Sequence, residues 1–104
     1  MGTRLLHIVY AAVICGVLSA PALANEKRKE SCAITAGIVS QAVFARMAGQ
    51  TPDEAKAALR ADGSGITGIY KATIPPLVDM VYGFEKSTLG QGVVDEYEAQ
   101  CLSF

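Results

Sequence analysis

The N-terminal segment constrains this chain most, because it decides which residues remain to fold and in which compartment they do so. An apolar run extends from Leu5 to Leu18, Arg4 precedes it, and small residues end it at Ala22-x-Ala24. This order is typical of a secretory signal peptide, which is removed in the mature protein. We therefore expect residues 1–24 to be a cleaved signal peptide and residues 25–104 to be a single helical domain. The mature protein is then expected to be periplasmic or secreted.

Two alternatives for this segment stay open. A retained anchor would need about 20 apolar residues to span the hydrocarbon, but the run is shorter and the highly charged stretch 25–30 follows it. A lipoprotein anchored at Cys15 would resemble bacterial lipidation signals, but Ile14 stands where those signals carry Gly, Ala or Ser. We favour cleavage after Ala24, with Pro21 breaking the helix just before the site. The mature chain would then have no permanent membrane anchor.

Cleavage would leave two cysteines, Cys32 and Cys101, near the two ends of an 80-residue domain. Disulfides persist in oxidising compartments, and a domain of this size buries too little surface to be robust alone. We therefore expect a Cys32–Cys101 disulfide. The chain-entropy relation gives about 4 kcal/mol for a loop of this length. A redox-active pair would instead be expected as Cys-x-x-Cys at a helix start.

Apolar residues recur at helical spacing in four segments of the mature chain. The first is Glu30–Ala48, ended by Gly49, and its predicted buried face is Cys32, Ala36, Val39, Val43 and Met47. The second begins at Thr51-Pro52-Asp53-Glu54, where Thr51 is the predicted N-cap and Glu54 completes a capping box. It is expected to stop at Asp62-Gly63.

The third helix is expected to begin near Thr73 and Ile74, because Pro75 and Pro76 are tolerated only in a first turn. Its predicted apolar face is Leu77, Val78, Val81, Tyr82 and Phe84. The last helix is expected to start near Ser87 or Thr88, with a capping box from Thr88 to Gln91, and to bury Leu89, Val93, Val94, Tyr97 and Cys101.

No segment alternates convincingly as a strand does, so the predicted fold class is all-α. The predicted architecture is a small four-helix up-and-down bundle, stapled by one disulfide from Cys32 to Cys101, because such a path returns the chain to its starting end. The alternative is three helices plus a short crossing helix.

The segment Gly63–Gly68 reads Gly-Ser-Gly-Ile-Thr-Gly and formally matches a dinucleotide-binding fingerprint. We reject that interpretation, because the fingerprint needs a strand before the glycines and a βαβ unit around them. A flexible loop is expected instead. Loops that carry an aromatic residue and a cation are common recognition elements, so the candidate binding-loop residues are Gly65, Tyr70 and Lys71.

The mature chain is poor in catalytic groups. After cleavage it has no histidine and no tryptophan, and its two cysteines are expected to be oxidised. The commonest general base, metal ligand and nucleophile are therefore missing. We predict no catalytic residues, no metal site and no cofactor, and hence no enzyme. The only basic run is Lys27–Lys29 at the expected new N-terminus, so no nucleic-acid partner is expected.

Several features resemble small exported, two-cysteine helical proteins of proteobacteria, which are largely uncharacterised. They are the signal peptide, a cysteine early in the first helix, Arg46-Met47-Ala48-Gly49 leading into Thr51–Glu54, the Val81-Tyr82 helix and Tyr97-x-x-x-Cys101. The resemblance brings no known activity with it. Periplasmic immunity proteins and periplasmic acid-stress chaperones are similar in size and build, but the chaperones differ in cysteine spacing.

Three functions follow as hypotheses, of which the least favoured is an enzyme activity that would require a buried carboxylate in a pocket. The favoured one is a non-catalytic binding or interaction module with a protein partner in the periplasm, in the manner of an inhibitor or immunity protein. The alternative is an envelope-stress or chaperone-like protein. Arg46 is expected only to complement the dipole at the end of its own helix.

Overall fold

A computed structural model describes the backbone of residues 2–104 and the side chains of residues 24–104, and it divides into two units, residues 1–30 and 31–104. Residues 2–30 of the first unit lie within helix α1 (Gly2–Met47), in which Lys29 Nζ and Glu26 Oε1 are 3.8 Å apart. This helix continues through Pro21, so the predicted break at that proline is wrong. The apolar run Leu5–Leu18, on which the signal-peptide prediction depends, lies outside the residues whose side chains the structure describes. Among residues 24–104, no helix is long and apolar enough to cross a membrane.

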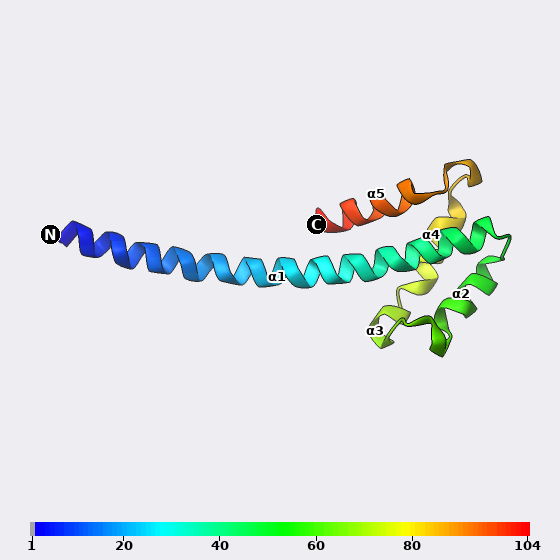
Figure 1. The fold of residues 1–104 in the computed structure, drawn as a ribbon, viewed down its shortest axis with the longest axis horizontal. Helices are drawn as coiled ribbons and strands as arrows, with labels where there is room; N and C mark the ends of the chain where they lie inside the picture. The colour runs from blue at the N-terminus through cyan, green and yellow to red at the C-terminus, as the bar shows by residue number, and fades with distance from the viewer. Residues whose placement is uncertain (1) are drawn as a thin grey trace. The chain divides into compact units, whose positions relative to one another are not determined.

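The second unit is all-α, as predicted (Figure 1). It contains the C-terminal part of α1, then α2 (Pro52–Arg60), α4 (Ile74–Gly83) and α5 (Gln91–Leu102). Two short 3-10 turns, Asp62–Ser64 and Lys86–Thr88, and the one-turn helix α3 (Gly68–Lys71) join them. Figure 1 shows α5 returning in the direction opposite to α1. Four helices and one disulfide thus form the small bundle that the sequence predicts, and α3 is an addition to it.

The core consists of one face each of α1, α2 and α4, closed by a single side chain of α5. Its buried members in the described part of the chain are Cys32, Ala36, Ile38, Val39, Ala42, Val43, Ala55, Leu59, Ile74, Val78, Val81 and Val94. Ala42 joins the predicted face of α1, whereas Met47 is 59% exposed, so its predicted burial is wrong. Met47 is the last residue of α1, where the chain turns away toward α2.

The end of α1 is fixed by a Schellman motif. Gly49 has a φ of 85°, a left-handed conformation that favours glycine. Its amide donates to the Arg46 carbonyl at 3.0 Å, and the Gln50 amide donates to the Ala45 carbonyl at 3.0 Å. The stop predicted at Gly49 is therefore confirmed.

The capping box of α2 is also confirmed. The Glu54 amide donates to the Thr51 hydroxyl at 3.2 Å, and the Thr51 amide donates to Glu54 Oε1 at 3.0 Å. The hydrogen bond from the Thr51 backbone is the larger cause that holds the pKa of Glu54 below its ordinary value, and the hydrogen bond with the Thr51 side chain is the smaller one. Two residues after Glu54, Lys56 Nζ lies 2.8 Å from Asp79 Oδ1, and this ion pair joins α2 to α4.

We expect Thr51→Ala to lower the free energy of unfolding at pH 7 by about 1 kcal/mol, because an amide of the first turn loses its acceptor. A folded-state pKa below the unfolded one means that Glu54 stabilises the fold above its unfolded pKa and ceases to do so as the pH falls through the folded value. Urea titrations of Glu54→Gln should therefore differ from wild type at pH 7 and converge on it in acid. An equal difference at neutral and acid pH would contradict the contribution of the Glu54 charge to the cap.

Helix α4 begins at Ile74 with both prolines in its first turn, as predicted. Phe84 is 41% exposed, so its placement on the buried face is wrong, because it follows the last helical residue. Helix α5 begins later than predicted, at Gln91, with Gly90 as its N-cap and no side-chain cap. The Thr88 hydroxyl instead donates to the Glu85 carbonyl at 2.7 Å within the 3-10 turn, so the predicted capping box is wrong.

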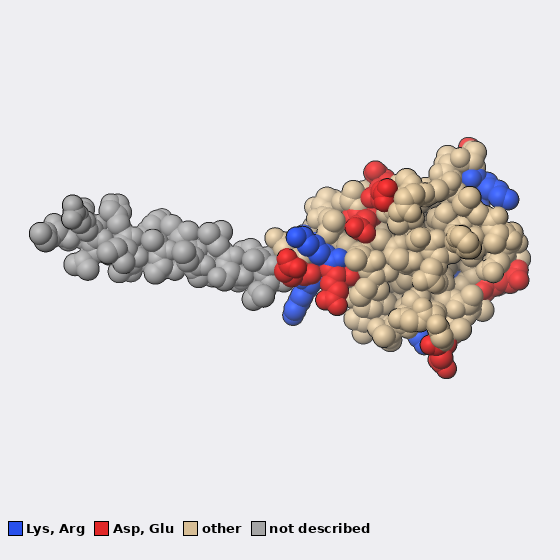
Figure 2. Space-filling model, viewed as in Figure 1, with Lys and Arg blue, Asp and Glu red and all other residues tan. Residues whose placement is uncertain are grey.

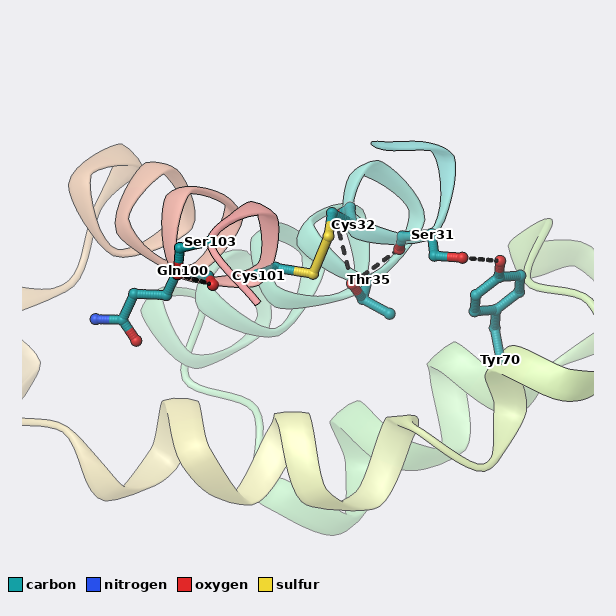
Figure 3. Close-up of a disulfide and its surroundings, with 7 residues drawn as sticks. All are labelled: Ser31, Cys32, Thr35, Tyr70, Gln100, Cys101 and Ser103. Atoms are coloured by element: carbon teal, nitrogen blue, oxygen red, sulfur yellow. Dashed lines mark hydrogen bonds between the residues drawn. A yellow bond between two sulfur atoms is a disulfide. The ribbon is translucent and has the colours of Figure 1, made fainter. Parts of the chain in front are cut away.

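The disulfide joins the two ends of the unit as predicted. Cys32 and Cys101 are bonded, with their Cα atoms 5.7 Å apart and a sequence separation of 69. Figure 3 shows the bridge between α1 and the last turns of α5. Beside it, the Thr35 hydroxyl donates to the Ser31 carbonyl at 3.0 Å. Cys32 is 1% exposed, so one sulfur of the bridge belongs to the core.

Candidate functional site

The glycine-rich segment predicted as a flexible loop is held to the body of the unit. The Ser64 hydroxyl donates to the Leu59 carbonyl at 2.7 Å and accepts from the Ile66 amide at 3.3 Å. Ile66 packs against the core. Gly65 has a φ of 82°, so a glycine is suited to the turn that follows the 3-10 segment.

Tyr70 and Lys71, the other candidate binding residues, make contacts within the fold. The hydroxyls of Tyr70 and Ser31 are 3.1 Å apart (Figure 3), and the Tyr70 ring packs against the core. Lys71 Nζ lies 3.9 Å from Asp62 Oδ1. Ile69, which lies between Gly68 and Tyr70 in the sequence, is 80% exposed. The structure thus places Gly65, Tyr70 and Lys71 in one region, but it engages the polar groups of Tyr70 and Lys71 there, and a binding role for the three stays a prediction.

Arg46 makes contacts beyond the predicted interaction with the dipole of its own helix. Its Nη1 donates to the Val81 carbonyl at 2.7 Å and to the Phe84 carbonyl at 2.5 Å, where α4 ends. Its guanidinium lies 5.6 Å from the centre of the Tyr82 ring, and the Tyr82 hydroxyl donates to the Gln50 carbonyl at 2.8 Å. Burial raises the pKa of Tyr82, and Arg46 opposes that rise. These contacts lock the end of α1 to the end of α4.

One exposed surface stands out on the C-terminal half of α1. We call it the Phe44 face and define it by Ser40, Gln41, Phe44, Met47 and Ala48 on α1, together with the walls that α2 and the start of α5 add on either side. Phe44 is 78% exposed. It borders a hollow of about 550 Å³ toward α2, and a second of about 280 Å³ toward α5. An aromatic side chain therefore projects between two hollows.

The Phe44 face is uncharged. Among the described residues that line its two hollows, none is Lys, Arg, Asp or Glu. The polar side chains there are neutral hydroxyls and amides, from Ser40, Gln41, Gln50, Ser64 and Gln91. In the view of Figure 2, the middle of the unit formed by residues 31–104 is likewise a broad uncharged area with charged side chains at its edges. Another uncharged surface can cover such a surface without burying an unpaired charge.

Reasoning from the sequence misses Phe44, although the sequence contains a signal for it. The residue follows Val43 of the buried stripe by one position, which turns its side chain about 100° away from that stripe. Its helical neighbours at three and four residues are Ser40, Gln41, Met47 and Ala48. A lone aromatic residue on the outer side of a core helix, with Ser40, Gln41 and Ala48 as small or polar neighbours beside Met47, is that signal.

A third hollow lies between α4 and α5, and we call it the α4–α5 groove. Its volume is about 480 Å³, and its lining residues are Met80, Phe84, Thr88, Gly92, Val93, Glu96, Tyr97 and Gln100. It shares no residue with the Phe44 face. One carboxylate, that of Glu96, is the only charged group in this described lining.

The described side chains do not gather the ligands of a metal ion, since residues 24–104 contain no group of three or more His, Cys, Asp or Glu placed to hold one. No charged or polar residue in this range is buried. The Phe44 face and the α4–α5 groove are candidate sites beside the predicted loop residues Gly65, Tyr70 and Lys71. No family model, curated protein or solved structure matches this chain.

Proposed function

We propose that this protein is an exported, non-catalytic interaction module that binds a folded protein partner through the Phe44 face. One observation carries the proposal: Phe44 is 78% exposed on an uncharged surface that has a hollow on either side of it. Interface cores are enriched in aromatic residues and Met, and are depleted of charge. The Phe44 face shares two of these features, because it exposes Phe44 together with Met47, one turn away at 59% exposure, and has no charged residue in its described lining.

The chemistry of the face defines the partner. Covering an exposed Phe side chain stabilises a complex by about 1.5–3 kcal/mol, so Phe44 fits the role of an anchor in a partner's pocket. The hollows beside it would receive apolar side chains of the partner. The hydroxyl of Ser40 and the amides of Gln41 and Gln50 would make hydrogen bonds around them. We therefore propose a partner surface that is itself uncharged and has a slot for an aromatic ring.

The remaining features support an exported and non-catalytic role. The Cys32–Cys101 disulfide is of the kind that persists in oxidising compartments, the periplasm or the exterior. Residues 25–104 contain no histidine, and both of their cysteines are in this bridge. A role in blocking another exported protein, as immunity proteins and inhibitors do, requires only such a binding surface.

A photo-crosslinking amino acid at position 41, in cells that export the protein, tests the proposal. Gln41 is exposed and borders the larger hollow. We expect one adduct of defined mass with a second, different protein, reduced at least tenfold by Phe44→Ser. Such a loss corresponds to about 1.4 kcal/mol or more. Because Phe44 is outside the core, the variant should fold, and its circular dichroism should equal that of wild type.

Phe104→Ser is the matched control, because Phe104 is 85% exposed and lies outside the Phe44 face. It should leave the adduct unchanged. An adduct insensitive to Phe44→Ser, equal losses with both variants, or no adduct would contradict the proposal. An adduct of twice the chain's own mass would replace the partner protein with a second copy, and would contradict this part of it.

The alternative is an envelope-stress or chaperone-like role. It predicts that acid or oxidative challenge exposes apolar surface of the protein. Since no charged residue in 24–104 is buried, the described part of the chain offers no buried group whose protonation would drive such an opening. We therefore give this alternative second place. Binding of an apolar-sensitive dye that stays flat from neutral to acid pH would speak against it.

A further inference from the structure

The α4–α5 groove has the size and lining of a small-molecule site. At about 480 Å³ it falls within the range of about 300–1,000 Å³ typical of ligand pockets, which are mostly apolar with a few polar groups. Met80 and Phe84 come from the α4 side, and Val93 and Tyr97 from α5. Both Met80 and Tyr97 are half-buried, so the groove has apolar walls that reach into the unit.

Two polar groups of the groove have unused hydrogen-bonding capacity. The hydroxyls of Tyr70 and Tyr82 are hydrogen-bonded, whereas that of Tyr97 has no partner among residues 24–104. The Glu96 carboxylate accepts one hydrogen bond, from Gln100 Nε2 at 3.0 Å. A carboxylate has about four acceptor positions, so Glu96 can accept more.

The charge of the groove selects among ligands that fit its apolar walls. Glu96 is the only charged residue in the described lining, and no ion pair within residues 24–104 involves it. An anionic head group would meet this carboxylate with no cation to offset the repulsion. A cationic head group would be attracted to it, and would also interact favourably with the Tyr97 ring.

We propose that the α4–α5 groove binds a single-chain amphiphile with a cationic head group. The alkyl chain packs against Met80, Phe84 and Val93, and the ammonium head group lies beside Glu96 and Tyr97. This site is independent of the Phe44 face, and the proposal does not rest on protein binding there.

Calorimetric titration of the oxidised protein with alkyltrimethylammonium ions below their micelle concentrations tests the site. We expect one ligand per chain, and affinity that rises about fourfold for each added methylene that the groove buries. At equal chain length the cation should bind at least fivefold more tightly than the alkyl sulfate. Glu96→Gln should remove most of this preference for the cation and keep the dependence on chain length.

Gly92→Leu is the blocking variant. A Cβ at Gly92 meets nothing within 4 Å, and leucine favours helix more than glycine does, so the variant should fold while its side chain occupies the groove. We expect at least a tenfold loss of affinity for the cation. Phe44→Ser, on the other surface, should bind as wild type does. Equal affinity for cation and sulfate, several ligands per chain, or binding unaffected by Gly92→Leu would overturn the proposal.

Discussion

Replacing both Cys32 and Cys101 with alanine lowers the free energy of unfolding by about 4 kcal/mol, because the unfolded chain gains the entropy that a 69-residue loop closure removes. For a domain of this size the melting temperature should fall by roughly 20 °C. Without the disulfide, α5 should be destabilised more than the other helices. Val94 is the one buried residue of this fully described helix, so the disulfide supplies much of what holds its C-terminal end to α1.

Hydrogen exchange can locate this loss. In the double variant, amides of α5 should lose protection before those of α4, which buries Ile74, Val78 and Val81. Wild-type protein treated with a reductant should behave as the double variant does. Ser103→Ala is the control, because Ser103 is exposed and its hydroxyl bonds only to the Gln100 carbonyl of the same helix end. A double variant that melts within a few degrees of wild type would contradict this role of the bridge.

Much of the fold could be predicted from local signals. The Thr51–Glu54 capping box, Gly49 and the paired prolines each fix a helix end through their own backbone chemistry, so their effects do not depend on distant residues. The disulfide could be predicted because the expected cleavage after Ala24 would leave two cysteines, and an up-and-down bundle brings their helix ends together. The capping box predicted at Thr88 does not form, because the Thr88 hydroxyl donates to the Glu85 carbonyl within the 3-10 turn.

The candidate surfaces depended on tertiary placement. The role of Phe44 could not be predicted, because the spacing of apolar residues identifies the buried face of a helix but does not show which exposed residues lie beside hollows. Such hollows depend on how α2 and α5 sit against α1 within the unit. Tyr70 and Lys71 looked free in sequence, and their partners, Ser31 and Asp62, are at distances in sequence that no local pattern connects.

Arg46 shows the same limit, and its substitution is the second large effect that we expect. Arg46→Ala should lower the free energy of unfolding by about 2 kcal/mol, because the carbonyls of Val81 and Phe84 lose a charged donor at 2.7 and 2.5 Å. The Val81 contact is partly buried, so water replaces the donor there only in part. The contact with the Tyr82 ring, 5.6 Å away, would be lost as well.

Three variants separate these contributions in chemical denaturation. Arg46→Met keeps the apolar stem of the side chain and should recover only a small part of the loss. Arg46→Lys keeps the charge without the planar group, and should fall between Met and wild type. Arg60→Ala removes an exposed arginine from the last turn of another helix, α2, and should cost less than about 0.5 kcal/mol. If Arg60→Ala costs as much as Arg46→Ala, the effect is one of general charge, and the link between the ends of α1 and α4 does not stabilise the fold.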